Sequence, residues 1–211
     1  MKLPSRAVAL AAAAGLAAAP LMMASPAQAA AGTNSLGDVL LADTVEGQPS
    51  FDKKGGDFDI LTAAVLAVLG DNADSSVKVL LDGTTTLTAF LPTDAAFERT
   101  GGDLGITAKN EANLTGKLVD ALGLSNIEQI LLYHVAPGVK INANAVADSD
   151  GAKLDMANGQ TVGVNVTNDG IFLKDKNQDV ANAKVVVTDI NKGNKQIAHA
   201  INRVLLPTLP A

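Results

Sequence analysis

The first half of the chain spaces its apolar residues as α-helices do. Between Phe58 and Leu69 these residues recur three or four positions apart, which predicts a helix that is capped by Asp57. The same spacing beside capping residues predicts three more helices, at 35–43, from Thr93 or Asp94 through Phe97, and at 114–123. We therefore expect a largely helical first half.

A capping box of Ser125 and Glu128 predicts another helix, which begins at Ser125 and carries Tyr133 and His134 before a Pro-Gly break. His134 lies one turn beyond Ile130 on the apolar face of this helix, so we expect its ring to be buried. A buried imidazole needs hydrogen-bond partners and can offer one donor and one acceptor to neighbouring loops. The other interpretation is that Tyr133 and His134 form an acid/base pair. Such a pair would need a nucleophile, and the chain contains no G-x-S-x-G motif to supply one.

The second half alternates polar and apolar residues or carries β-branched runs between Gly-containing turns. These patterns predict strands at 139–146, 161–167, 170–174 and 183–190, followed by a closing segment at 197–207. Two earlier runs, 77–81 and 86–91, flank Asp82-Gly83 and predict a β-hairpin. Because helices precede strands instead of alternating with them, the pattern predicts an α+β fold.

The N-terminus has the three parts of a secretory signal peptide. Lys2 and Arg6 precede an apolar, Ala-rich run, and Ala27-Gln28-Ala29 is an A-x-A cleavage site. We expect cleavage after Ala29, which leaves 211 − 29 = 182 residues and suits one domain. The expected organisation is a signal peptide at 1–29, a flexible start at 30–34, one domain at 35–207 and a tail at 208–211.

Charge and cysteine content narrow the possible functions. Removing the signal peptide changes the net charge from −6 to −8, because the removed segment holds two basic residues and no acid. An acidic surface repels nucleic acid and anionic membranes, so neither is an expected partner, and we expect no membrane insertion after cleavage. The chain has no cysteine, which excludes disulfides, thiol nucleophiles and a lipidated cysteine. We expect a free, secreted protein.

Three segments in order resemble the fasciclin-like domain family, and in particular its secreted bacterial single-domain members. They are TLTAFLPTDAAF (86–97), LLYHVAPG (131–138) and the closing VVVTDI…IAHAINRVLLP (185–207). The resemblance implies one domain over 35–207, with helices packed on a β-sheet wedge that the second half mainly forms. It also implies a set of motif residues with structural roles: Thr93, Asp94, Phe97, Tyr133, His134 and His199.

The same resemblance implies that Asp189 and Ile190 take part in adhesion through cell-surface receptors. They follow the β-branched run 185–188 and precede the polar stretch 191–194, so we expect them to leave the sheet and reach solvent. An exposed Asp could offer its carboxylate to a metal held by the receptor. The alternative is that Asp189 only begins a turn.

No metal site or cofactor is expected. Two distant histidines without a carboxylate at ligand spacing do not make a zinc site. The stretch 175–179 matches the opening D-x-N-x-D of a calcium loop, but Val180 and Val186 replace the required Gly and Glu. With no catalytic constellation either, we do not expect an enzyme.

Two functions remain open from the sequence. The first is a secreted, non-enzymatic adhesion module, expected to be a monomer, that binds an unknown protein or glycan at a cell surface. The alternative is an extracellular carrier that holds a small apolar ligand in a groove of the domain, which the 47% hydrophobic content allows.

Overall fold

The computed structural model describes residues 31–209, so the predicted signal peptide at 1–29 lies outside the described residues. The helices are α1 (Leu36–Leu41), α2 (Asp59–Asp71), the 3₁₀-helix η1 (Ser76–Leu81), α3 (Asp94–Asp103), α4 (Glu111–Leu122), α5 (Leu124–Leu132) and α6 (Ala143–Ala147). The strands are β1 (Thr44–Val45), β2 (Gln48–Pro49), β3 (Leu87–Pro92), β4 (Val135–Pro137), β5 (Lys153–Asp155), β6 (Thr161–Thr167), β7 (Gly170–Lys174), β8 (Ala183–Ile190) and β9 (Gln196–Ile201).

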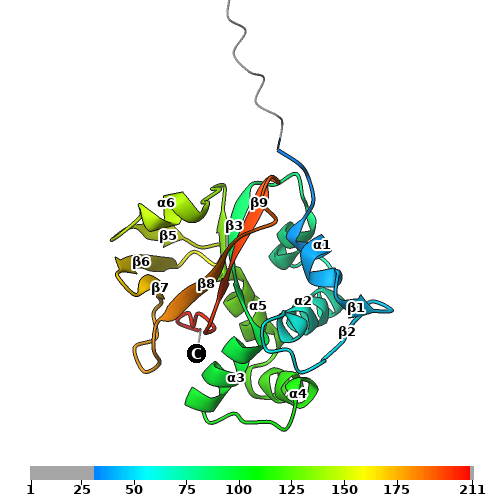
Figure 1. Cartoon of the computed structure of the whole chain (residues 1–211). Helices are drawn as coiled ribbons and strands as arrows, with labels where there is room; N and C mark the ends of the chain where they lie inside the picture. The colour runs from blue at the N-terminus through cyan, green and yellow to red at the C-terminus, as the bar shows by residue number, and fades with distance from the viewer. Residues whose placement is uncertain (1–30, 210–211) are drawn as a thin grey trace, which may run out of the picture. The chain divides into compact units, whose positions relative to one another are not determined.

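The main sheet has the strand order β4-β3-β9-β8-β7-β6-β5. Strands β3 and β9 run parallel, although 109 positions (197 − 88) separate them in sequence at the pair Thr88–Ile197, and the other neighbours are antiparallel. Helices α1 to α5 lie on one side of β3 and β9, while β5, β6, β7 and α6 lie on the other (Figure 1). The predicted α+β fold is thus confirmed.

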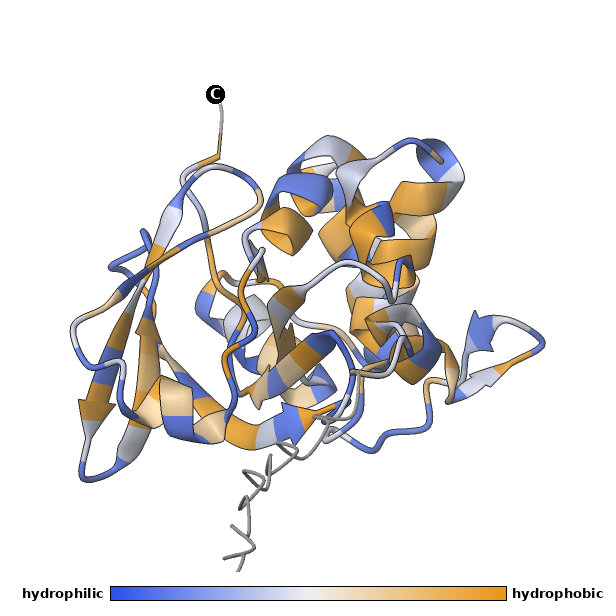
Figure 2. Cartoon of the chain, turned by 90° about the horizontal axis from the view of Figure 1, so that it is seen from above, coloured by the Kyte–Doolittle hydropathy of each residue, from blue (hydrophilic) through white to orange (hydrophobic). Residues whose placement is uncertain are grey.

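Strand β3 separates two hydrophobic cores. Side chains alternate between the faces of a strand, and all six residues of β3 are buried. Leu87, Ala89 and Leu91 pack into the core shared with the helices. Phe90 packs into a second core with residues of β6, β7 and β9. The helical half shows long apolar stretches, whereas the strands of the wedge alternate between apolar and polar residues (Figure 2).

The predicted hairpin at 77–81 and 86–91 is wrong in its first arm, because Ser76–Leu81 forms the 3₁₀-helix η1. Val77 and Leu80 are both buried, and their spacing of three residues places them on one side of such a helix. The hydroxyl of Ser75 accepts a hydrogen bond from the amide of Val77 and caps the helix. A short β-branched run therefore does not form a strand here, since cap and burial both favour the helix.

Two helix starts also differ from the prediction. Phe58, not Asp57, occupies the N-cap of α2, and α5 begins at Leu124 without a side-chain cap, so the Ser125 capping box does not form. Glu128 instead accepts a hydrogen bond from the Ser75 hydroxyl and ties α5 to η1.

The segment after Pro137-Gly138 differs as well. The prediction of a strand at 139–146 is wrong, because residues 139–142 form no strand and Ala143–Ala147 forms helix α6, which Asn142 caps. The expected flexible start is hydrogen-bonded to the turn before β9: Gly32 donates to Gly193 and accepts from Lys195. None of the helices in the described part of the chain has the length and apolarity of a membrane span.

Candidate functional site

His134 connects helix α5 to the C-terminal segment. Its Nδ1 lies 2.7 Å from the carbonyl oxygen of Ile130, and the amide of Leu205 donates to its Nε2 at 2.9 Å. Because the amide can only donate, Nε2 is the acceptor and Nδ1 carries the proton. Burial lowers the pKa of His134 to about 4. The ring is therefore neutral at physiological pH and both of its nitrogens are in use.

Tyr133 faces the other core, although it precedes His134 directly. Its side chain is fully buried and its hydroxyl donates to the carbonyl oxygen of Thr161 at 2.9 Å. Burial, with a smaller contribution from the charge of Asp175, raises the pKa of Tyr133 to about 12. The two residues diverge into different cores and do not form an acid/base pair.

The motif residues at the start of α3 tie two helices together. The Thr93 hydroxyl accepts from the amide of Ala96 and caps α3. The carboxylate of Asp94 accepts from the amides of Asp59 at 3.1 Å and Ile60 at 2.9 Å, so it caps α2 across 35 positions of sequence. This contact replaces the cap that Asp57 was predicted to provide.

His199 occupies the strand β9 with no exposed surface. Its Nε2 lies 2.8 Å from the carbonyl oxygen of Ile141, and its Nδ1 accepts weakly from the amide of Asp189 at 3.4 Å. The ring stacks on Phe90 with centroids 5.9 Å apart. Burial lowers the pKa of His199. Its two nitrogens, like those of His134, are used to join segments of the fold.

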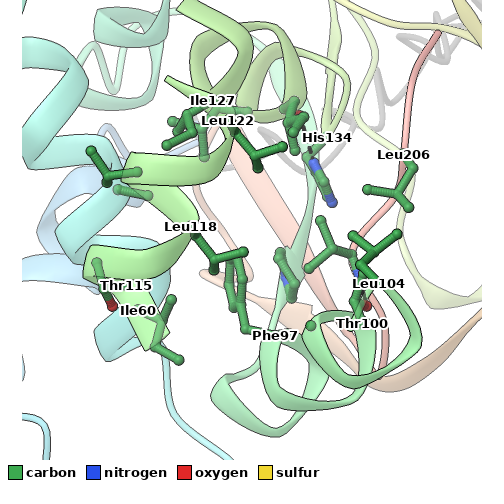
Figure 3. A pocket seen from close by; sticks show the side chains of 17 residues that line it. Ile60, Phe97, Thr100, Leu104, Thr115, Leu118, Leu122, Ile127, His134 and Leu206 are labelled. Carbon is green, nitrogen blue, oxygen red and sulfur yellow. Dashed lines mark hydrogen bonds between the residues drawn. The ribbon is translucent and has the colours of Figure 1, made fainter. Parts of the chain in front are cut away.

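An apolar pocket lies between the helices beside Phe97 and His134 (Figure 3). Helices α2 to α5 and the segment around Leu206 line it, and its volume is about 50 Å³. An apolar cavity that binds benzene measures about 150 Å³. The pocket is therefore too small in this structure for a ligand of benzene size.

Asp189 is less exposed than predicted. Its side chain is 16% exposed, its Oδ1 accepts from the amide of Ala143 at 2.7 Å, and its Oδ2 pairs with the ammonium of Lys192 at 3.1 Å. Its backbone is left-handed, with φ of 61°. Ile190 is partly buried against the helical core. The expectation that this pair reaches solvent freely is thus wrong for Asp189, whose carboxylate holds the start of α6.

The solvent-exposed residues at this end of β8 come just before Asp189. Val186 and Val187 are 50% and 51% exposed, and Thr188 is exposed too. Sequence reasoning missed them because a β-branched run is normally buried. A signal was present: three β-branched residues in a row must place at least one on each face of a strand.

The family comparison agrees with this architecture. The family model of the fasciclin domain matches residues 63–207, which is more than two thirds of the chain. The chain therefore belongs to the fasciclin family. A solved structure, described as a FAS1 domain pair from the insect cell adhesion molecule fasciclin I, matches with 19% identity and a TM-score of 0.44. That match covers 68% of this chain and 44% of the solved one, so the chain spans less than half of its length. No curated protein matches the chain.

Proposed function

We propose that this protein is a secreted, non-enzymatic adhesion module whose β8 strand binds a protein partner at a cell surface. Membership of the fasciclin family supports an adhesion role of this general kind. The observation that carries the proposal is the pair Val186 and Val187, each about half exposed on a strand with a free edge.

The free edge follows from the strand register. β8 pairs with β7 only through Ala183 and Lys184, whereas its pairing with β9 continues to Ile190. Within the described residues, 186–190 therefore have a strand neighbour on the β9 side alone. The register shifts twice along this stretch, as β-bulges do, and bulges are common at sheet edges and binding sites.

A polypeptide suits this surface better than a glycan does. An exposed strand edge offers main-chain groups to an added strand, and neighbouring side chains give specificity. The large hydrophobic residues exposed in the described part of the chain are Leu and Val, without an aromatic ring among them. Asp189 stabilises this surface, because its contacts with the amide of Ala143 and the ammonium of Lys192 hold the end of β8 in place.

Cell attachment tests the proposal. The variant Val186→Ser/Val187→Ser should lose most attachment of cells to protein-coated surfaces, because it removes the exposed apolar side chains. A matched control, Val45→Ser/Val139→Ser, changes two exposed valines elsewhere and should attach like the unmodified protein. Equal attachment by both variants, at equal coating density, would remove β8 as the binding surface.

The carrier alternative receives less support. Its best site is the apolar pocket, and about 50 Å³ holds a few small atoms rather than a lipid or a ring. A retained ligand in native mass spectrometry of the secreted protein would favour the carrier and show that the pocket opens.

A further inference from the structure

Five aspartates converge where the loop before α2 meets the start of α3. Carboxylate oxygens of Asp43, Asp52 and Asp57 lie within 4.8 Å of one another, and so do those of Asp57, Asp59 and Asp94. Asp57 belongs to both groups. These residues are up to 51 positions apart in the sequence (94 − 43), so it is the tertiary fold that brings them together.

Backbone amides fix the buried half of this cluster. Asp59 and Asp94 are 3% and 0% exposed. Asp94 accepts from two amides at the start of α2, and Asp59 accepts from the amides of Ser50 and Asp52, both at 3.3 Å. The positive end of the α2 dipole adds to these contacts. Both carboxylates thus have partners that account for their positions.

Asp57 lacks such partners. Both of its carboxylate oxygens are buried, and neither accepts a hydrogen bond from the protein. Within residues 31–209 they are the buried side-chain polar atoms that have no partner. A buried polar group without a partner costs about 1–3 kcal/mol, and more when it is charged. These oxygens therefore point to a ligand that the protein alone does not supply.

The charge of the cluster points to a cation. Against the acidic groups of the cluster stand the ammonium of Lys54, which pairs with Asp52, and a helix N-terminus worth about half a unit charge.

We propose that Asp43, Asp52 and Asp57 bind one calcium ion, with the buried Asp59 and Asp94 packed behind them. When three oxygens lie no more than 4.8 Å apart, one position exists that is within about 2.8 Å of all three. This distance is close to the 2.3–2.6 Å of calcium–oxygen bonds. Asp43 and Asp52 are exposed, so water can complete the six to eight ligands that calcium takes. This site differs from the loop at 175–179 that the sequence analysis rejected.

The type of site sets the expected affinity. Calcium tolerates irregular, high coordination, whereas magnesium demands an octahedron, so the ion is calcium rather than magnesium. Calcium must displace Lys54 from Asp52, which weakens binding. We expect a dissociation constant in the range of extracellular modules, about 10⁻⁴–10⁻³ M. The inference is independent of the adhesion proposal.

Calorimetric titration with CaCl₂ tests the site on the full mature chain. The unmodified protein should bind one ion, Asp57→Asn should bind at least about tenfold more weakly, and Asp179→Asn should bind normally. Asp179 is the matched control because it is an exposed acid in the rejected loop. If Asp57→Asn fails to fold, Asp43→Asn serves as the second variant. It lies at an exposed position and should also weaken binding.

Three results would overturn the site. One is the absence of binding heat at several millimolar CaCl₂ together with an unchanged melting temperature against NaCl of equal ionic strength. Another is full binding by both Asp57→Asn and Asp43→Asn. The third is an equal loss in Asp57→Asn and Asp179→Asn, which would show general attraction to an acidic surface.

Discussion

The end of α5 and the outer part of β8 both carry residues of fasciclin-type motifs, yet they differ in what is left for a partner. At the end of α5, Tyr133 and His134 are buried and their polar side-chain atoms have partners within the protein. On β8, Val186 and Val187 stay half exposed beside a strand edge. The first segment therefore maintains the fold, whereas the second keeps apolar side chains exposed to solvent.

The largest expected effect comes from His134→Ala. The change leaves a cavity beside the apolar pocket and an unpaired amide at Leu205, so the free energy of unfolding should fall by about 2–4 kcal/mol. Denaturant titration measures this. An unchanged denaturation midpoint would show that His134 does not stabilise the fold, and His134 would again be a candidate functional residue.

The pH dependence of stability should distinguish His134 from the acidic cluster. His134 has a pKa of about 4 when folded and 6.5 when unfolded, so the unfolded chain binds more protons between these values. Its contribution, about 3 kcal/mol, is present above pH 6.5 and is lost as the pH falls toward 4.

Asp94 should act in the opposite direction. Its folded pKa of about 8 lies above the ordinary 3.8, so its contribution is present below about pH 4 and is lost as the pH rises toward 8. Unfolding curves of His134→Ala and Asp94→Asn at several pH values, each compared with the unmodified protein, measure both slopes. Slopes of the same sign would contradict the assigned environments.

Tyr133→Phe should have a smaller effect. It removes one hydrogen bond to Thr161 without a large change in shape, which costs about 0.5–1.5 kcal/mol. Because Tyr133 is the only tyrosine, ultraviolet titration reads its ionisation directly, and this should occur near pH 12 while the protein is folded. Ionisation near pH 10 in folded protein would show that the ring is not buried.

The smallest effect is expected for Asp189→Asn, below about 0.5 kcal/mol. Asn keeps an acceptor for the amide of Ala143 and tolerates the left-handed backbone, and the exposed pair with Lys192 contributes little. Asp189→Ala should cost more, about 1 kcal/mol, since it loses both features. Equal melting temperatures of the two variants would show that the carboxylate does not hold α6.

Local patterns predicted much of the fold. Periodicity indicated the helices that became α2 and α4, and turn residues bounded the strands at 161–167, 170–174 and 183–190, as the structure has them. The pattern failed at 77–81, where burial of only two residues decides between a strand and a 3₁₀-helix. A five-residue run contains too few positions to separate periods of two and three.

The sites were predictable only in part. The apolar face of α5 indicated that His134 is buried, but its partner Leu205 lies 71 positions away and no local pattern reveals it. The acidic cluster was missed for the same reason, since Asp94 meets Asp57 only after α2 and α3 pack together. Exposure of Val186 depends on where β7 ends, which is also a tertiary property.

One crossed experiment tests the central claim most directly: cell attachment and unfolding free energy are measured on the same preparations of His134→Ala and Val186→Ser/Val187→Ser. We predict that His134→Ala, assayed where it is folded, loses stability and keeps attachment. The β8 variant should lose attachment and keep its stability within about 1 kcal/mol, as exposed substitutions usually do. Loss of attachment in folded His134→Ala, with full attachment by the β8 variant, would contradict the account.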